Sequence, residues 1–219
     1  MVERYVYYLD EENLFKKKLE KFKWYPGFAL AQKQRSSQNL QAEFKAVKPN
    51  SKILEVSSAS TNELGRKLSA FNLMLKTTHG SYSVEQVFQA GKVFEQAGKQ
   101  EQLLKLPSRE AKAKVKALNS TDKLVAFSIF GENFSLEPKT FFYNWNYLHA
   151  LNQNKNLAKE VIKFDAFTDI HFNYKRQINC QAEACSIYVS LYRRDLLAEA
   201  LASKDNFLQI VYGENTNHK

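Results

Sequence analysis

The sequence predicts an α+β fold in which helices dominate. Glycine and proline number only 7 and 4 in 219 residues, which argues against a loop-rich all-β fold. Stretches with the apolar spacing of helices alternate with short β-prone runs that follow no regular period. Hydrophobic residues make up 44% of the chain and charged residues 25%, as in ordinary globular proteins.

The first elements are a strand over 5–9 and a basic, aromatic run, FKKKLEKFKW, over 15–24. The dipeptide Pro26-Gly27 predicts a turn, and a mostly polar helix follows over 28–47. The sequence KPNS then breaks this helix. We therefore expect an N-terminal basic and aromatic extension over residues 1–50, a main domain over 51–195, and a C-terminal helix, strand and tail over 196–219.

The later elements are assigned from β-branched runs, helical periodicity and breakers. Further strands are expected over 53–56, 68–75, 124–130, 167–172 and 207–212, and the final residues, GENTNHK, are expected to fray. Further helices are expected from 83 to a stop at Gly98, then over 108–118, 137–152, 157–164, 178–194 and 196–202.

The helix that follows Ser83 carries the strongest chemical signal. Ser83 and Gln86 form a capping box, which specifies where the helix begins. Glu85, Gln89 and Lys92 are spaced i, i+4 and i+7, so a helix would place them on one stripe. A carboxylate, an amide and an amine facing one cavity are suited to a sugar or a phosphate ligand.

The net charge of the chain indicates which kind of partner it would attract. The chain carries +9 at neutral pH, which favours a polyanion such as nucleic acid or a pyrophosphate, although many proteins are basic only for solubility. No run of about 18 apolar residues occurs, so no membrane span is expected. The N-terminus lacks the layout of a secretory signal, and we expect a cytoplasmic protein.

No metal and no organic cofactor are expected. Cys180 and Cys185 read as two small thiols on one helix, and with His171 they supply too few ligands for a confident metal site. The segment from Gly91 to Lys99 has the wrong spacing for a phosphate-binding loop and lies in a helical pattern.

Three segments together resemble a known family. LSAFN (68–72), VEQVFQAGKVF (84–94) and REAK (109–112) are similar to motifs of the NADAR family, also called YbiA-like. Over nearly the whole chain, runs such as KWYPGFALAQKQRS, ILEVSS, FYNW, FDAFTDI and INCQA resemble the NADAR antitoxins associated with DarT-type DNA ADP-ribosyltransferase toxins. The resemblance implies a NADAR/YbiA-like single domain with a small sheet.

The resemblance also implies a reaction, the hydrolysis of ADP-ribose from guanine bases in DNA by the antitoxin of a toxin–antitoxin pair. The expected partners are ADP-ribosylated DNA, ADP-ribose and a cognate DNA ADP-ribosyltransferase toxin. Two alternatives stay open. One is an N-glycosidase acting on a small ribosylated metabolite, and the other is a module that binds ADP-ribose or nucleic acid without turnover.

Cleavage at an anomeric carbon develops positive charge, which a carboxylate can stabilise. Glu85 is the first candidate, because a position in the first turn of a helix favours its ionised form. Lys92 would neutralise a phosphate or attack an opened ribose aldehyde. Asp169 is the second carboxylate, with Asp165 behind it.

The expected ligand-binding residues offer amides, a hydroxyl and a guanidinium: Ser69, Asn72, Gln89, Arg109, Asn179 and Gln181. The expected nucleic-acid contacts are aromatic and basic, namely Trp24, Tyr25, Lys33 and Arg35, with Phe28 beside them. For these aromatic and basic residues a structural role is an equal alternative. In that role they would pack the N-terminal segment against the core and would not contact nucleic acid.

Overall fold

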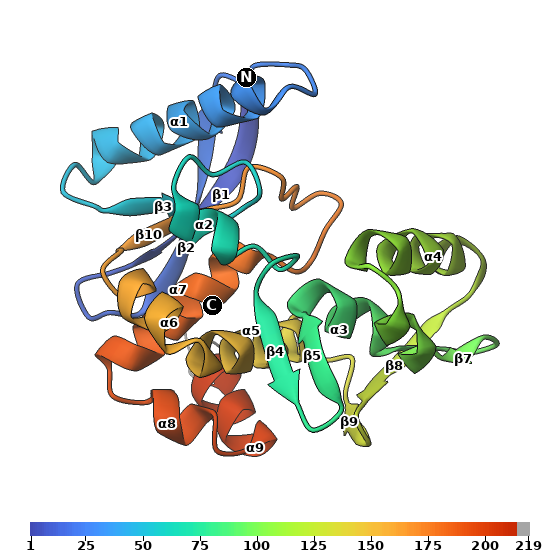
Figure 1. Cartoon of the computed structure of the whole chain (residues 1–219). Helices are drawn as coiled ribbons and strands as arrows, with labels where there is room; N and C mark the ends of the chain where they lie inside the picture. Colours follow the sequence, from blue (N-terminus) through green and yellow to red (C-terminus); the bar gives the residue numbers. More distant parts are fainter. Residues whose placement is uncertain (214–219) are drawn as a thin grey trace. The chain divides into compact units, whose positions relative to one another are not determined.

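The computed structural model describes residues 1–213 (Figure 1). Its helices and small sheets confirm the α+β class with helices dominant. Backbone contacts divide the chain into two compact units, each described by itself below. The first unit comprises Met1–Ser69 and Asn154–Lys219, and the second comprises Ala70–Gln153. The expected division at residues 50 and 195 stays a prediction.

The first unit is built on a sheet with the strand order β2-β1-β10-β3. The strands are β1 (Val2–Leu9), β2 (Phe15–Phe22), β3 (Ile53–Glu55) and β10 (Ala166–Thr168). β1 runs antiparallel to both β2 and β10, whereas β10 and β3 are parallel. The parallel pair aligns Thr168 with Glu55, a register that matters for the chemistry below.

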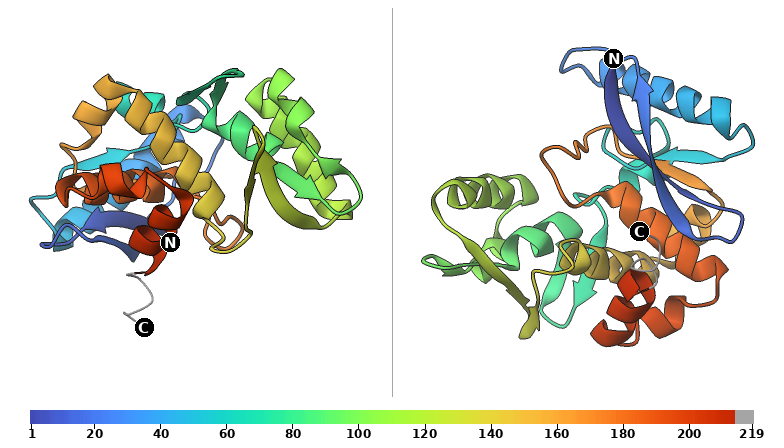
Figure 2. Two further views of the ribbon diagram at one scale, coloured as in Figure 1. Left: turned by 90° about the horizontal axis from the view of Figure 1, so that it is seen from below. Right: turned by 180° about the vertical axis from the view of Figure 1, so that it is seen from behind.

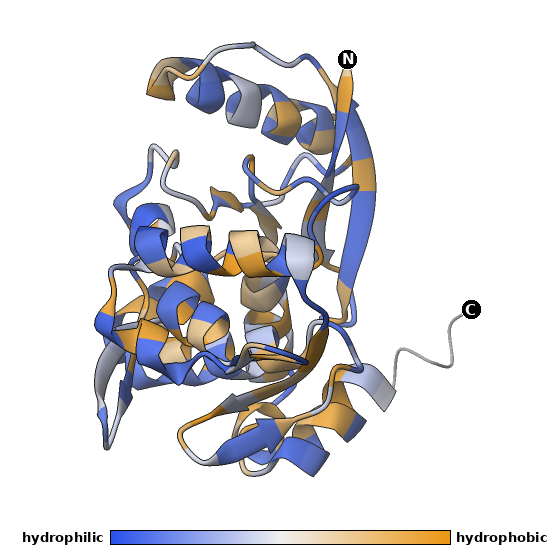
Figure 3. Cartoon of the chain, turned by 90° about the vertical axis from the view of Figure 1, so that its right-hand side faces the viewer, coloured by the Kyte–Doolittle hydropathy of each residue, from blue (hydrophilic) through white to orange (hydrophobic). Residues whose placement is uncertain are grey.

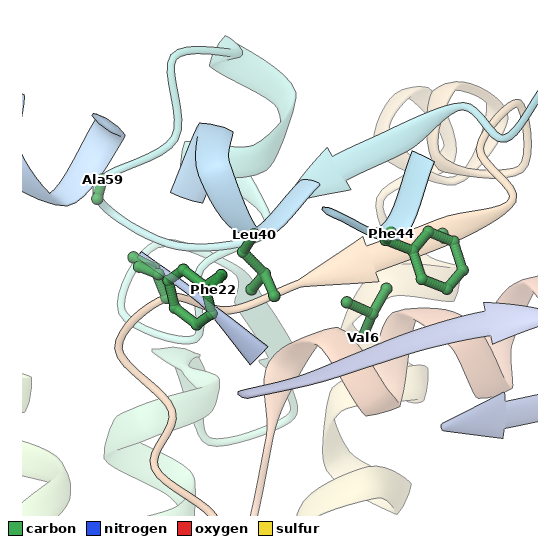
Figure 4. Packing of buried hydrophobic residues seen from close by; sticks show 7 residues of the cluster. Val6, Phe22, Leu40, Phe44 and Ala59 are labelled. Atoms are coloured by element: carbon green, nitrogen blue, oxygen red, sulfur yellow. The ribbon is translucent and has the colours of Figure 1, made fainter. Parts of the chain in front are cut away.

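Two helices cover this sheet, α1 (Leu30–Val47) and α7 (Gln181–Arg193). Leu40 and Phe44 of α1 pack with Val6 and Phe22, and all four are fully buried (Figure 4). Successive strand residues face opposite sides, so Tyr7 lies on the other face, where its side chain is hydrogen-bonded to that of Cys180 at the start of α7. Figure 2 shows the two helices beside the long strands β1 and β2.

The amphipathic character of α1 explains its position. Its buried residues Ser36, Ser37, Leu40 and Phe44 recur three and four apart, which places them on one face of the helix. In Figure 3 the ribbon of α1 accordingly changes between hydrophilic and hydrophobic colours along its length. Burial of this face holds the helix to the sheet.

The remaining helices of the first unit are short. They are α2 (Glu63–Lys67), α6 (Lys155–Val161), α8 (Leu197–Ala200), α9 (Lys204–Phe207) and a π-helical turn, Leu208–Gly213. The strand predicted over 207–212 is therefore wrong. Ser203 caps α9 by accepting a hydrogen bond from the Asn206 N–H, and the chain continues as helix from there. The predicted frayed tail lies outside the described residues, apart from Gly213.

The second unit contains a hairpin, a small sheet and three helices. The hairpin is β4 (Met74–Thr77) with β5 (Gly80–Ser83), and the sheet has the order β7-β6-β8-β9. Its strands are β6 (Lys92–Phe94), β7 (Gly98–Lys99), β8 (Leu124–Ile129) and β9 (Glu132–Phe134). Helix α3 (Val84–Ala90) packs against α4 (Ser108–Thr121), α5 (Phe141–Gln153) and the short 3₁₀ helix Glu101–Lys105.

The predicted helix from Ser83 to Gly98 is right at its start and wrong at its end. Ser83 and Gln86 form the expected capping box, but α3 ends at Ala90. The chain then enters β6, where Lys92 pairs with Phe127 and Val93 with Ala126. Gly98 lies in β7 with a φ of 65°. Pairing with the distant strand β8 outweighs the helical periodicity of this segment.

Other boundaries also differ from prediction. The strand predicted over 68–75 begins only at Met74, after α2. The strand predicted over 167–172 ends at Thr168, and a turn follows in which the Phe172 N–H donates to the carbonyl of Asp169. Helix α7 begins at Gln181, so Asn179 precedes it.

Gly65 of α2 is held in a space too small for any side chain. A Cβ atom there would lie 1.9 Å from the carbonyl oxygen of Glu55 and 2.4 Å from Ser60 Oγ. We expect Gly65→Ala to lower the free energy of unfolding by about 1–3 kcal/mol, because backbone must move to admit it. Urea unfolding measures the loss. Gly213→Ala is the control, because a Cβ atom at Gly213 would have its nearest neighbour 4.0 Å away. An equal loss of stability in the two variants would contradict the prediction.

Candidate functional site

Glu85 is a buried carboxylate with a fixed orientation in the second unit. It lies in the first turn of α3, and its backbone N–H donates to the carbonyl of Ala70 at 2.9 Å. Its side chain is inside the unit, with the residue only 5% exposed. Oε1 accepts a hydrogen bond from Gln89 Nε2 at 2.9 Å and pairs with Lys112 Nζ at 3.0 Å. Both contacts are made by Oε1, so among residues 1–213 Oε2 is the oxygen left for a ligand.

Lys92 lies beside this carboxylate, although it is not on the helix. It is the first residue of β6, it is 8% exposed, and its Nζ lies 4.8 Å from the ring centroid of Phe88. The pKa of its amine is lowered to about 8, because burial lowers it, the charge of Glu85 partly opposes this, and the positive charge of Lys112 adds to the lowering. At this pKa about a tenth of the amine is neutral, and therefore nucleophilic, at pH 7.

A glycine makes the step from α3 to β6 possible. Gly91 caps the helix, and a Cβ atom there would lie 2.3 Å from Phe142 Cζ. The absence of a side chain lets the chain leave the helix close against α5 and present Lys92 one residue later. The expected helical stripe of Glu85, Gln89 and Lys92 is therefore wrong at Lys92, which lies in β6, although the charge of Glu85 still acts on its amine.

Lys112 is a site residue that the sequence reasoning did not select. It comes from α4, pairs with Glu85, and lies 5.1 Å above the ring of the exposed Phe71. The REAK motif contains it, so the signal was present. The structure thus brings LSAFN, VEQVFQAGKVF and REAK together through Phe71, Glu85 and Lys112.

The remaining predicted residues of the second unit lie at its surface. Asn72 is exposed and directly follows Phe71, while Arg109 is exposed in the first turn of α4. Both flank residues of the cluster in sequence, which suits contacts with the outer part of a ligand. Ser69 belongs to the first unit, where it is 1% exposed.

Asp169 is a buried acid of the first unit, 7% exposed, just after β10. Burial raises its pKa to about 8, and the neighbouring charge of Glu55 raises it as well. Its Oδ1 accepts a hydrogen bond from the His171 N–H at 3.0 Å, and the side chain of Gln181 also hydrogen-bonds to it. Asn179 Oδ1 is buried and accepts no hydrogen bond from the residues described.

Asp165, the carboxylate considered after Asp169 as a catalytic candidate, has a structural role. Its Oδ1 accepts a hydrogen bond from Arg193 Nη2 at 3.0 Å, and its Oδ2 accepts one from the Lys52 N–H at 3.0 Å. These contacts tie the start of β10 to α7 and to the residue before β3. The carboxylate is thereby occupied on both oxygens.

The N-terminal aromatic residues range from partly buried to fully exposed. Trp24 is partly buried against the core cluster around Val6, with the Arg4 guanidinium 5.6 Å from its ring. Two cations lie near the ring of Tyr25, with Arg35 at 4.2 Å and Lys23 at 5.2 Å from its centroid. Lys33 is half-buried on α1. Phe28 beside them is fully exposed.

The described residues contain no cluster of three or more histidine, cysteine or acidic side chains arranged to hold a metal ion. Cys180 and Cys185 are both buried and not disulfide-bonded. Within residues 1–213, no helix combines the length and the apolar character that a membrane span requires.

The pKa of Lys92 is expected to respond in opposite directions to its two charged neighbours. Glu85→Gln removes a stabilising anion and should lower this pKa below about 8, whereas Lys112→Met removes a repelling cation and should raise it. NMR titration of lysine labelled with carbon-13 at Cε measures both, with the Lys92 signal assigned from its loss in Lys92→Arg. Shifts of the same sign in both variants would contradict the electrostatic account.

A family model described as the DarT1-associated NADAR antitoxin matches residues 2–219. A search of curated proteins found no match.

The match places the chain in the NADAR class, whose members are hydrolase-like. Within that class, the chain belongs to the family of DarT1-associated NADAR antitoxins. An antitoxin role follows from this membership.

Proposed function

We propose that this antitoxin removes ADP-ribose from guanine bases in DNA. The observation that carries the proposal is the cluster of Glu85, Lys92 and Lys112, in which one buried carboxylate lies beside a buried amine and an exposed one. An anionic, ribose-containing substrate needs both signs of charge, because its phosphates are negative while its anomeric carbon becomes positive during cleavage. The family's association with the DarT1 toxin supports a substrate that such a toxin makes.

The reaction adds water across the bond between the ribose anomeric carbon and the base nitrogen. The bond breaks with its electron pair going to the base, which takes up a proton, and the anomeric carbon takes the hydroxyl. Glu85 stabilises the positive charge at that carbon or deprotonates the attacking water. Gln89 and Lys112 orient its carboxylate for this role through their contacts with Oε1.

Lys92 has two roles in the proposal, and one experiment separates them. It either neutralises a phosphate or attacks the aldehyde of the opened ribose as a neutral amine, releasing water to form a Schiff base. Its low pKa supports the second role. Borohydride reduction in the presence of substrate would leave a stable adduct on Lys92, with a yield that rises with pH around 8. If no adduct forms, Lys92 does not form a Schiff base, and its remaining role is to neutralise a phosphate.

Asp169 is the second carboxylate of the proposal, because a buried acid that keeps its proton near neutral pH is suited to protonate the departing base. The DNA contacts are assigned to Tyr25, Lys33 and Arg35, with Trp24 anchoring that segment to the core. Affinity for DNA that falls steeply with added salt would support contacts with phosphates.

The alternatives stay distinct from this proposal. A glycosidase acting on a small ribosylated metabolite would use the same cluster but would gain nothing from DNA flanking the modified base. A binding module would retain ADP-ribose or the toxin without releasing product. The net charge of +9 favours the DNA substrate over a metabolite.

The test is incubation of the protein with an oligonucleotide that carries ADP-ribose on one guanine, scored for released ADP-ribose. Release that restores unmodified guanine supports the proposal. Comparison with the modified mononucleoside separates the DNA enzyme from a metabolite glycosidase. Binding of the oligonucleotide without release would replace the proposal with the binding module.

A further inference from the structure

Glu55 is a buried carboxylate with no role in the reaction proposed above. It ends β3 in the first unit and is 5% exposed. Its Oε1 accepts hydrogen bonds from Ser57 Oγ at 2.6 Å and from the Ile170 N–H at 2.9 Å. Its Oε2 accepts from Thr168 Oγ1 at 2.7 Å and from Ser37 Oγ at 2.8 Å. All four donors are uncharged, so they solvate the carboxylate without neutralising it.

The hydroxyl donors are themselves oriented toward Glu55. Ser57 Oγ accepts a hydrogen bond from the Ala59 N–H at 3.1 Å, and Thr168 Oγ1 accepts one from Gln41 Nε2 at 3.2 Å. Each oxygen therefore has its own hydrogen left to donate to Glu55. These donors favour the ionised carboxylate, but burial outweighs them, and the pKa of Glu55 is raised above its usual value.

Two of these donors stand immediately on either side of Asp169. Thr168 precedes it and Ile170 follows it, and the Val56 N–H donates to the carbonyl of Thr168 at 2.7 Å. The parallel pairing of β3 with β10 sets this register. Glu55 thus holds the backbone segment that carries Asp169, and its charge acts on the Asp169 carboxyl.

The other groups that act on this pair come from three places in the first unit. β1 contributes Arg4 and Tyr7, the turn after Asp169 contributes the N–H groups of His171 and Phe172, and the start of α7 contributes Cys180 and Gln181. Glu183 of α7 acts in turn on Tyr7 and Cys180. Arg4 favours an ionised Asp169, and so do the hydrogen bonds from the His171 N–H and Gln181. Burial and Glu55 oppose them and prevail, since the pKa of Asp169 is raised to about 8.

We propose that Glu55 is a positioning residue for Asp169, because its carboxylate holds the residues on both sides of Asp169 and so fixes the place of that side chain. This inference rests on the proposed function, in which Asp169 takes part in the reaction. A protonated Asp169 gives its proton to the base nitrogen as the bond to the anomeric carbon breaks, and solvent water restores the proton afterwards. An ionised Asp169 cannot make this transfer.

The test is Glu55→Gln, which keeps the shape of the side chain and removes its charge. NMR titration of aspartate labelled with carbon-13 at the carboxyl, with the signal assigned from Asp169→Asn, should show the Asp169 midpoint moving below about 8. The alkaline limb of the pH–rate profile should move to lower pH with it. An unchanged midpoint in the folded variant overturns the inference, and so does a shifted midpoint with an unchanged rate profile.

A milder variant keeps the test decisive if Glu55→Gln does not fold. Ser37→Ala removes one donor from α1 without touching β10, and it should move the Asp169 midpoint in the same direction by a smaller amount. Ser190→Ala is the matched control, because it removes a buried serine hydrogen bond to the carbonyl of Asn13. The titration of Asp169 needs no substrate. It therefore tests the effect of Glu55 on Asp169 even if the protein does not release ADP-ribose from DNA.

Discussion

Glu85→Gln is expected to reduce release of ADP-ribose from the modified oligonucleotide by about 10²–10⁴-fold, the range for losing a general acid or base. The amide still accepts the hydrogen bond from Gln89, because it has the same shape as the carboxylate. It loses the charge that stabilises the anomeric carbon or accepts a proton from water. Single-turnover release assays measure the effect directly.

The matched control is Glu63→Gln, because Glu63 also pairs with a lysine, Lys67 at 2.7 Å, but lies on the surface of α2. It should release product at the rate of the unchanged protein. Affinity for the modified oligonucleotide should survive in Glu85→Gln, since the lysines that meet phosphates remain. Equal turnover in Glu85→Gln and the unchanged protein, with the fold intact, would remove Glu85 from the mechanism.

Asp169→Asn is expected to stabilise the first unit, most strongly above about pH 8. The pKa of Asp169 is raised from 3.8 to about 8 in the folded protein, so the folded state keeps a proton that the unfolded state loses between these values. The stability of the unchanged protein should fall as pH rises through this window and level off above it. The rise of about 4.2 pKa units, from 3.8 to about 8, sets an upper limit of about 6 kcal/mol, and we expect a few kcal/mol.

Urea unfolding at several pH values measures this difference. Trp24 reports on the first unit, and a Trp145→Phe background silences the tryptophan of the second. The two proteins should be about equally stable near pH 4, where Asp169 is protonated in the folded state. A difference between them that does not change with pH would contradict the buried, protonated acid. A gain in stability with a loss of turnover would be typical of an active-site residue.

Local signals in the sequence were enough for several elements. The capping box of Ser83 and Gln86 depends on residues three apart, and it correctly placed the start of α3. The helix after Pro107 and the strand over Leu124–Ile129 were also predicted, because a breaker or a β-prone run marks each one. Contacts within a few residues of the chain decide such features.

Features that depend on distant partners were missed. Lys92 was assigned to a helix, but pairing with Phe127 of β8 makes it a strand residue. Lys112 was not selected, because its contact with Glu85 exists only when α4 packs on α3. Glu55 was part of a β-prone run, and its role depends on hydroxyl groups of Ser37 and Thr168 that the fold brings to it.

The sequence by itself determined the α+β class, the resemblance to the NADAR antitoxins and the choice of Glu85, Gln89, Lys92 and Asp169. These follow from residue types and short spacings, which the linear chain displays directly. Only the tertiary structure decided which groups are buried, and therefore that the Lys92 amine and the Asp169 carboxyl both have a pKa of about 8. Burial and charge–charge contacts set these values, and both arise when segments far apart in the chain pack together.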